Sequence, residues 1–371
     1  MKRIIVFSYD FPPNTGGIAR LTENIALHLA LNTHKDYEII VLTKKVMYRK
    51  PVNDRVRIIE VNPSYKGRLF ESYKYLSSLD NKDQTIVICG LWWPEGFVAE
   101  LAGIKNIFIL THAAEIRPDN TWFRKKIWIP IIAKLILTKA TGVIANSEFT
   151  SSISKQLAPK ANVYCLPLAV DHKLFIPTGY KRSTNCLNII TITRIHLWKG
   201  LDTILNAIIK LPPDIRKNIQ WEIAGKGPDE SILKKMVSES PIKDQVKFLG
   251  FVDDKELPKL YSSADLFALC TRADENSSNI EGFGLVFLES QACGTPTIGT
   301  HFGGIPSAIE HNNGGWLINN EQELTTLITR LYYNRNLIED QSKLARTRVE
   351  NFFTWNYYIS NIMKITGISS C

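Results

Sequence analysis

Short apolar runs rich in β-branched residues alternate along the chain with longer segments whose apolar residues recur at helical spacing. The segment 17–31, for example, keeps Ile18, Leu21, Ile25 and Leu29 on one face of a helix. Because the short runs are apolar on both faces, the pattern predicts parallel sheets that helices cover on both sides. The first series of expected strands comprises 3–9, 38–43, 57–61, 85–90, 107–111 and 142–147.

The pattern then repeats, which predicts a second domain of the same class. Residues 166–181, between the two series, hold two prolines and a glycine and show neither period, so we place the domain boundary near residue 178. Residues 330–368 predict two terminal helices separated near 352–355. The fold class is therefore α/β, with two doubly wound domains and a ligand cleft where the carboxyl ends of their strands face each other. The second series of expected strands comprises 188–193, 220–224, 246–250, 265–270, 296–300 and 315–318.

Composition excludes several classes of protein. Of the 371 residues, 44% are hydrophobic and 22% charged. No apolar run approaches the roughly 20 residues that span a bilayer, which excludes an integral membrane protein. Residues 1–10 begin with a basic pair, but only 4–7 form an apolar run, so we expect a first strand rather than a signal peptide. The six cysteines show no CxxC spacing, which favours a reduced, cytoplasmic protein over a disulfide scaffold or a zinc site.

The net charge of +9 lies entirely in the first half of the chain. Residues 1–175 hold 24 Lys and Arg against 15 Asp and Glu, whereas the remainder is neutral. A basic half attracts nucleic acid, anionic lipid or a phosphorylated substrate, and it also favours solubility. The charge alone does not choose between these partners.

Two glycine-rich turns follow expected strands. Gly16 and Gly17 end the first βα turn and open a helix, whose free N–H groups attract anions. Gly225 and Gly227 follow the second strand of the second domain, where small residues leave room for a planar ring or a backbone contact. Tight turns alone would also explain all four glycines, and the G-x-G-x-x-G spacing of dinucleotide-binding folds is absent.

Charged residues concentrate at two further places in the second domain. Arg194 and Lys199 follow its first strand, and such a pair is suited to neutralise a diphosphate, although two solvated loop charges would show the same pattern. Further along, Glu281 precedes a glycine-flanked loop and Glu289 lies on the helix after it. Carboxylates accept hydrogen bonds from polyol hydroxyls, and the loop N–H groups can donate to sugar or phosphate oxygens. Because the helix around Glu289 is apolar, its charge needs a partner.

Eight motifs in order make the chain resemble the retaining GT-B glycosyltransferases of family 4, or glycosyl transferases group 1. Glu281 and Glu289 match the E-x7-E motif of that group. The resemblance covers nearly the whole chain and implies two Rossmann-like domains. The first, 1–178 plus about 354–371, would hold the acceptor, and the second, 179–353, a nucleotide-diphosphate-sugar donor. It also implies a last helix that crosses back to the first domain, no metal and no cofactor. The motifs are PPNTGG, THAAE, ANS, LPLAVD, R-x4-KG, G-x-G-P, EGFG-x4-E and HFGGIP.

The resemblance also implies roles for single residues. Arg194 and Lys199 match the pair that holds the donor diphosphate. Glu289 matches the carboxylate on the ribose hydroxyls, and Glu281 the one beside the transferred sugar. His112 matches the histidine that positions this sugar, although Ala113 stands where the family's H-G-x-E motif has glycine. The expected catalytic residues are therefore His112, Arg194, Lys199 and Glu281, and the donor site adds Gly16, Gly17, Gly225, Gly227, Phe283, Gly284, Leu285 and Glu289.

The residues favour a retaining, metal-independent reaction. No pair suggests an inverting mechanism with a dedicated base, and the acidic pairs at 253–254 and 274–275 fall in expected turns. We therefore expect the leaving diphosphate, neutralised by Arg194 and Lys199, to take the acceptor proton on the face of attack. Catalysis would rest on positioning and charge stabilisation.

Residues 122–140 combine aromatic, basic and apolar side chains. We expect a helix that starts at Pro130 and buries 131–137 in the first domain. A surface facing anionic lipid or the acceptor would consist of Trp122, Phe123, Arg124, Lys125 and Lys126, joined by Lys44, Lys45, Arg49 and Lys50.

The sequence therefore predicts a hexosyltransferase of bacterial surface polysaccharide synthesis, such as that of O-antigen, lipopolysaccharide or capsule. It would move a hexose or N-acetylhexosamine from a UDP- or GDP-linked donor to a glycan or lipid-linked acceptor. We expect it in the cytoplasm, peripheral on the inner face of the cytoplasmic membrane. A nucleotide-sugar 2-epimerase of the same fold is the alternative, but that class does not resemble the EGFG-x4-E pattern. A nucleic-acid-binding protein is disfavoured because no ordered basic and aromatic stripe is present.

Overall fold

The computed structural model describes residues 2–179, 185–274 and 279–369, which fold into two compact units. Unit 1 comprises 2–167 and 355–369, and unit 2 comprises 168–274 and 279–354. Residues 168–178 therefore belong to unit 2, whereas the sequence analysis places the boundary near 178. The last two residues of the expected connection, 180 and 181, lie outside the described residues.

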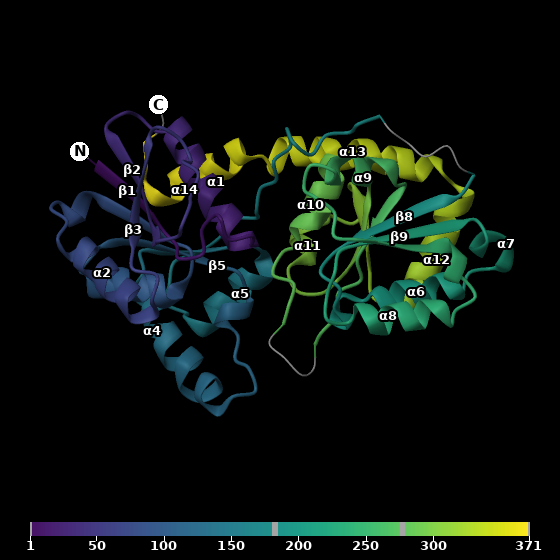
Figure 1. The fold of residues 1–371 in the computed structure, drawn as a ribbon, viewed down its shortest axis with the longest axis horizontal. Helices are drawn as coiled ribbons and strands as arrows, with labels where there is room; N and C mark the ends of the chain where they lie inside the picture. The colour runs from purple at the N-terminus through teal and green to yellow at the C-terminus, as the bar shows by residue number, and fades with distance from the viewer. Residues whose placement is uncertain (1, 180–184, 275–278, 370–371) are drawn as a thin grey trace. The chain divides into compact units, whose positions relative to one another are not determined.

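Unit 1 is built on a seven-stranded parallel sheet in the order β3-β2-β1-β4-β5-β6-β7 (Figure 1). All six predicted strands are present, and β7 is an additional strand too short to show a period. The order reverses between β1 and β4, so this is the switch point at which ligands of such sheets bind. The strands are β1 (Lys2–Phe7), β2 (Tyr37–Lys44), β3 (Val56–Val61), β4 (Thr85–Cys89), β5 (Asn106–Thr111), β6 (Gly142–Ala145) and β7 (Val163–Cys165).

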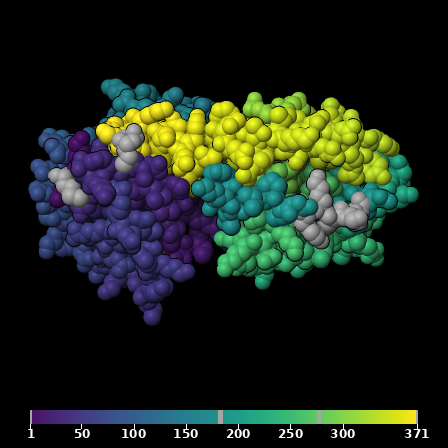
Figure 2. All heavy atoms as spheres, turned by 90° about the horizontal axis from the view of Figure 1, so that it is seen from above, coloured from purple at the N-terminus to yellow at the C-terminus, as the bar shows by residue number. Residues whose placement is uncertain are grey.

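Helices cover both faces of this sheet (Figure 1). Helices α2, α3 and α4 enclose one apolar core, while α1 packs against α14 on the other face. The ring of His28 on α1 stacks on Trp355 of α14 at 5.6 Å, and in Figure 2 the yellow C-terminal helix lies beside the purple residues of the same unit. The last helix thus returns to unit 1, as predicted. The helices are α1 (Gly17–Asn32), α2 (Tyr65–Ser77), α3 (Phe97–Leu101), α4 (Lys134–Lys139), α5 (Glu148–Leu157), α14 (Trp355–Thr366) and the short segments Lys82–Gln84, Trp92–Gly96, Ala114–Ile116 and Arg124–Ala133.

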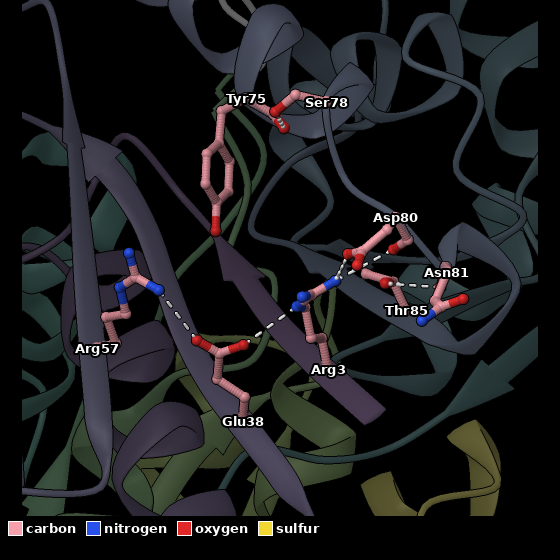
Figure 3. Close-up of polar contacts among 8 residues, drawn as sticks. All are labelled: Arg3, Glu38, Arg57, Tyr75, Ser78, Asp80, Asn81 and Thr85. Carbon is pink, nitrogen blue, oxygen red and sulfur yellow. Dashed lines mark hydrogen bonds and ion pairs between the residues drawn. The ribbon is translucent and has the colours of Figure 1, made fainter. Parts of the chain in front are cut away.

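Ion pairs hold the amino edge of this sheet together (Figure 3). Glu38 on β2 lies 3.1 Å from Arg3 on β1 and 3.2 Å from Arg57 on β3. The Arg3 guanidinium also pairs with Asp80 at 2.7 Å and holds the pKa of that carboxyl below its usual value. These charged side chains pair with one another and stabilise the sheet. The candidate functional residues lie at the opposite, carboxyl edge.

Unit 2 has a six-stranded parallel sheet in the order β10-β9-β8-β11-β12-β13, with helices on both faces (Figure 1). A break at 353–354 separates α13 from α14, where the sequence predicted one. The strands are β8 (Leu187–Ile192), β9 (Ile219–Ala224), β10 (Val246–Gly250), β11 (Leu266–Ala268), β12 (Thr297–Thr300) and β13 (Gly315–Ile318). The helices are α6 (Leu201–Ile209), α7 (Pro213–Arg216), α8 (Glu230–Ser238), α9 (Leu257–Ser263), α10 (Leu285–Ala292), α11 (Ile305–Ala308), α12 (Glu321–Tyr333), α13 (Asn336–Phe352) and the short turns Leu197–Lys199 and Lys243–Gln245.

No helix within the described ranges combines the length and the apolar character that a bilayer crossing requires.

Candidate functional site

Lys199 and Glu281 form an ion pair at the carboxyl edge of the unit 2 sheet. The Lys199 Nζ lies 2.6 Å from Glu281 Oε2, and the two side chains are only 14% and 16% exposed. The same ammonium lies 4.3 Å from the centre of the Trp198 ring, a cation–π contact that further fixes it. Two residues 82 positions apart, predicted to hold the diphosphate and the transferred sugar, are thus brought together.

Arg194 lies on the same loop and is exposed. Within the part of the chain that the structure describes, its guanidinium makes no ion pair or hydrogen bond. The loop itself is held firmly: Ile195 N–H donates to the Lys226 carbonyl at 3.0 Å, and Leu197 N–H to Asp229 Oδ2 at 2.8 Å. A free cation on a fixed loop suits the predicted role in binding a diphosphate.

Gly225 and Gly227 are explained by backbone packing. A Cβ at Gly225 would lie 1.9 Å from the Thr193 carbonyl oxygen, and one at Gly227 would lie 2.0 Å from that of Ile195. The two glycines therefore allow a close backbone contact with the loop that carries Arg194. Their contact with a donor stays a prediction.

The loop with Glu281 leads directly into α10. Gly284 precedes the helix with φ +90°, and a Cβ there would lie 2.6 Å from the Phe287 ring. The Phe283 side chain is buried, whereas the N–H groups of Phe283, Gly284 and Leu285 belong to the helix start. On the other side, Gly304 N–H donates to the Glu281 carbonyl at 2.8 Å. The backbone around the Glu281 carboxylate is therefore fixed from both directions.

Glu289 has the partner that its apolar surroundings require. The Tyr261 hydroxyl donates to Glu289 Oε2 at 2.9 Å. Burial, followed by the nearby carboxylate, raises the pKa of Tyr261 well above its ordinary value, so this hydroxyl remains a donor.

His112 lies at the carboxyl end of β5 in unit 1. Its ring Nε2 is 3.0 Å from the Gly90 carbonyl oxygen, and its backbone N–H donates to Glu115 Oε1 at 2.7 Å. Ala113 has φ +88° and ψ −60°, a conformation that strains any residue with a Cβ. Glycine adopts this backbone conformation without strain, which explains why the family's motif has glycine at this position. The turn beside His112 keeps the same conformation with alanine in its place.

Gly16 and Gly17 begin α1 at the same edge of unit 1. Asn14 Nδ2 donates to Asp10 Oδ1 at 2.8 Å within the preceding turn, and a Cβ at Gly17 would meet no atom within 4 Å. Arg49 donates to the Pro12 carbonyl and lies 3.1 Å from Glu60, with its side chain 7% exposed. The prediction that Arg49 belongs to a lipid-facing surface is therefore wrong.

Only some of the side chains at 122–126, which were predicted to form a surface, are exposed. Trp122 and Phe123 are 69% and 53% exposed, and Lys125 and Lys126 are exposed. Arg124 instead folds back and donates to the carbonyls of Arg117, Ala114 and Glu115 at 3.0–3.2 Å. It is therefore a structural residue of the His112 turn.

The helix after this surface also differs from the prediction. Pro130 lies inside the segment Arg124–Ala133 rather than at a helix start. The segment is wound in wider i→i+5 turns, which accommodate a residue that lacks the N–H donor. Ile131 and Leu135 are 48% and 53% exposed, so the expectation that 131–137 is wholly buried is wrong.

Sequence analysis missed Glu95, which is 1% exposed and lies at the β1/β4 switch point. Its Oε1 accepts the Tyr9 N–H at 3.0 Å, while Oε2 has no hydrogen-bond partner among the described residues. Burial raises the pKa of this carboxyl to about 7. The only signal was a glutamate in the apolar stretch after an expected strand.

Residues 180–348 match the family glycosyl transferases group 1. The GDP-mannose-dependent α-(1-6)-phosphatidylinositol monomannoside mannosyltransferase of Mycobacterium tuberculosis is 28% identical over 352 residues, which cover 86% of this chain and 85% of that protein. The putative colanic acid biosynthesis glycosyltransferase of Escherichia coli is 29% identical over 207 residues, 54% of this chain and 50% of that protein.

Solved structures show the same fold over both units. The sucrose-phosphate synthase of Thermosynechococcus elongatus superposes with a TM-score of 0.77 at 20% identity, covering 98% of each chain. HepE of Anabaena in complex with UDP-glucose gives a TM-score of 0.73 at 16% identity, covering 99% of this chain and 100% of that one. Residues 180–348 thus match the glycosyl transferases group 1, and both units have the architecture of a two-domain GT-B fold.

Proposed function

We propose that the chain is a retaining, metal-independent transferase that moves a hexose or N-acetylhexosamine from a UDP- or GDP-linked donor to a glycan or lipid-linked acceptor. The observation that carries this proposal is the Lys199–Glu281 pair in the domain that matches group 1, where Arg194 on the same loop as Lys199 is unpaired among the described residues. Relatives named for phosphatidylinositol mannoside and colanic acid synthesis support a role in polysaccharide or glycolipid synthesis. A solved neighbour that holds UDP-glucose supports a nucleotide-sugar donor.

In the reaction, Arg194 and Lys199 would bind the diphosphate and stabilise the negative charge that grows on it as the glycosidic bond breaks. The leaving diphosphate would take the acceptor proton on the face of attack, which retains the anomeric configuration. Glu281 now neutralises Lys199, so the incoming diphosphate would share the ammonium with this carboxylate or displace it. The N–H groups at the start of α10, Glu281 and His112 would orient the sugar.

Calorimetry with UDP and GDP tests the donor site and the division of roles between the two glutamates. Glu289→Ala should weaken binding of the preferred nucleotide at least about tenfold, because a charge-assisted ribose contact is worth about 1.5–3 kcal/mol. Glu281→Ala should leave that affinity unchanged or raise it, since Lys199 loses its competing partner, while sugar transfer falls. Equal losses of nucleotide affinity in both variants would reject the separate roles of Glu281 and Glu289. Failure of the parent protein to bind either nucleotide would reject a UDP- or GDP-linked donor.

We also propose that the exposed aromatic and basic residues Trp122, Phe123, Lys125 and Lys126 contact an anionic membrane, which places the protein on the inner face of the cytoplasmic membrane. An aromatic pair beside cations is the pattern of interfacial binding. Each cation near an anionic bilayer contributes about 1 kcal/mol, less as salt rises.

The protein should therefore sediment with anionic but not neutral liposomes, and salt should release it. Lys125→Ser with Lys126→Ser should reduce binding roughly tenfold or more, since two contributions of about 1 kcal/mol are lost. Lys155→Ser with Lys160→Ser, the same charge change at two other exposed lysines of unit 1, should not. Equal effects of the two double variants on liposome binding would contradict a specific membrane contact through Lys125 and Lys126.

A further inference from the structure

Asp229 occupies the N-cap position of helix α8, but its side chain does not cap that helix. An aspartate at an N-cap normally accepts a hydrogen bond from a backbone N–H of the first helical turn. Within the described part of the chain, the Asp229 carboxylate makes no such bond to α8. Its Oδ2 instead accepts the N–H of Leu197, in the loop 194–199, at 2.8 Å and 32 positions earlier in the chain. The carboxylate thus holds a segment other than its own helix.

The loop 194–199 carries the two cations that are proposed to bind the donor diphosphate. Arg194 is exposed at its start, and Lys199 ends it with a side chain that is 14% exposed. The same Asp229 oxygen lies 3.8 Å from His196 Nδ1, beyond hydrogen-bond distance. Asp229 therefore contacts the loop at its middle, between the two cations.

Backbone contacts hold the loop on either side of this anchor. Ile195 N–H donates to the Lys226 carbonyl at 3.0 Å, and Asp229 N–H donates to the Ile195 carbonyl at 3.4 Å. Towards the other end, the Trp198 carbonyl accepts the Arg272 N–H at 2.9 Å. Because the anchor in the middle is made by the Asp229 side chain, a substitution removes it and spares these backbone contacts.

The negative charge of Asp229 is unfavourable beside a site for a diphosphate. By charge alone, a carboxylate that contacts the loop of Arg194 and Lys199 weakens the attraction of these cations for an anion. Fixing the loop has the opposite effect, because cations that are already held in place lose less conformational freedom when the ligand binds. The two effects differ in sign, so a substitution at Asp229 distinguishes them.

We propose that Asp229 is a positioning residue of the donor site, which holds the loop 194–199 in the geometry that Arg194 and Lys199 need to bind a diphosphate. This inference rests on the proposed function, since it takes the two cations as the ligands of the donor diphosphate. It deepens that function by naming a residue that strengthens the preference for a nucleoside diphosphate over a monophosphate without contacting the phosphates.

The test is calorimetry with the nucleotide, UDP or GDP, that binds the parent protein, and with the corresponding monophosphate. The ratio of the two dissociation constants measures the preference for diphosphate, because contacts with the base and the ribose are common to both ligands. Asp229→Ala should lower this preference at least about fivefold, since binding must then order the loop. Asp229→Asn keeps an oxygen that accepts the Leu197 N–H and should keep most of the preference.

Asp265→Ala is the matched control. Asp265 also accepts a backbone N–H, from Asn188 at 2.7 Å, and its side chain is 26% exposed against 28% for Asp229. It directly precedes β11 at the amino edge of the same sheet, so this change should leave the preference for diphosphate unaltered. A general loss of stability would affect both alanine variants.

Hydrogen exchange of the Leu197 amide measures the anchor without any nucleotide. The amide should exchange faster in Asp229→Ala than in the parent protein or in Asp265→Ala, because it loses its acceptor. Unchanged exchange in Asp229→Ala would contradict the anchor.

The proposal is overturned if Asp229→Ala keeps or raises the preference for diphosphate, since the charge of Asp229 would then outweigh any positioning. It is also overturned if Asp229→Asn or Asp265→Ala loses as much of the preference as Asp229→Ala. These results leave the proposed function standing. By contrast, a parent protein that binds the monophosphate as tightly as the diphosphate would refute Arg194 and Lys199 as diphosphate ligands, and with them the proposed donor site.

Discussion

Replacing Lys199 with alanine should lower kcat/KM for sugar transfer by about 10²–10³, and Arg194→Ala should do the same. In the proposed reaction, both cations would stabilise a charge that is largest in the transition state, and removing one such group costs about 2–4 kcal/mol of activation free energy. The measurement is the rate of transfer from a sugar donor linked to the nucleotide, UDP or GDP, that calorimetry shows to bind. Near-normal turnover in both purified variants would contradict the diphosphate clamp.

The two variants should differ in stability, which separates their structural and catalytic effects. Arg194 is exposed without a described partner, so Arg194→Ala should not change the free energy of unfolding. Lys199→Ala leaves the Glu281 carboxylate, only 16% exposed, without its 2.6 Å partner and should destabilise unit 2. Lys210→Ala provides a control, because it removes a lysine paired with Glu321 from the same unit while its side chain is 61% exposed.

The architecture and the motif residues could be predicted from the sequence because they depend on local patterns. Apolar runs located six strands in each unit, and the spacing from Arg194 to Lys199 and from Glu281 to Glu289 indicated groups at strand and helix ends. The Lys199–Glu281 pair itself spans 82 positions, and no local pattern specifies which of several oppositely charged residues will meet.

Where prediction failed, a tertiary contact decided the outcome. Arg124 belongs by sequence to a basic cluster, but three carbonyls of the His112 turn hold it. Pro130 is a good first residue of a helix, yet a wider helical turn accepts it in the middle. The environment of Glu95 depends on three strand ends that are distant in sequence.

Glu95→Gln should stabilise unit 1 in a strongly pH-dependent way. Burial raises the pKa of Glu95 from 4.5 to about 7, so the folded protein binds a proton here that the unfolded chain releases between these values. The free energy of unfolding therefore falls as the pH rises through this window, by about 3 kcal/mol once pH 8 is reached. Glutamine keeps an oxygen that accepts the Tyr9 N–H but carries no charge. The free energy of unfolding of the variant therefore does not fall with pH at this site.

Urea unfolding followed by tryptophan fluorescence at pH 5 and pH 8 measures the effect. The stability of Glu95→Gln relative to the parent protein should rise by about 2–3 kcal/mol between the two pH values. Glu71→Gln is the matched control: Glu71 also accepts one backbone N–H, from Asn62 at 2.7 Å, but it is exposed. A pH-independent difference for Glu95→Gln would show that the fold compensates the charge of the buried carboxylate, with Arg68, whose charge lowers the pKa of Glu95, as the candidate partner.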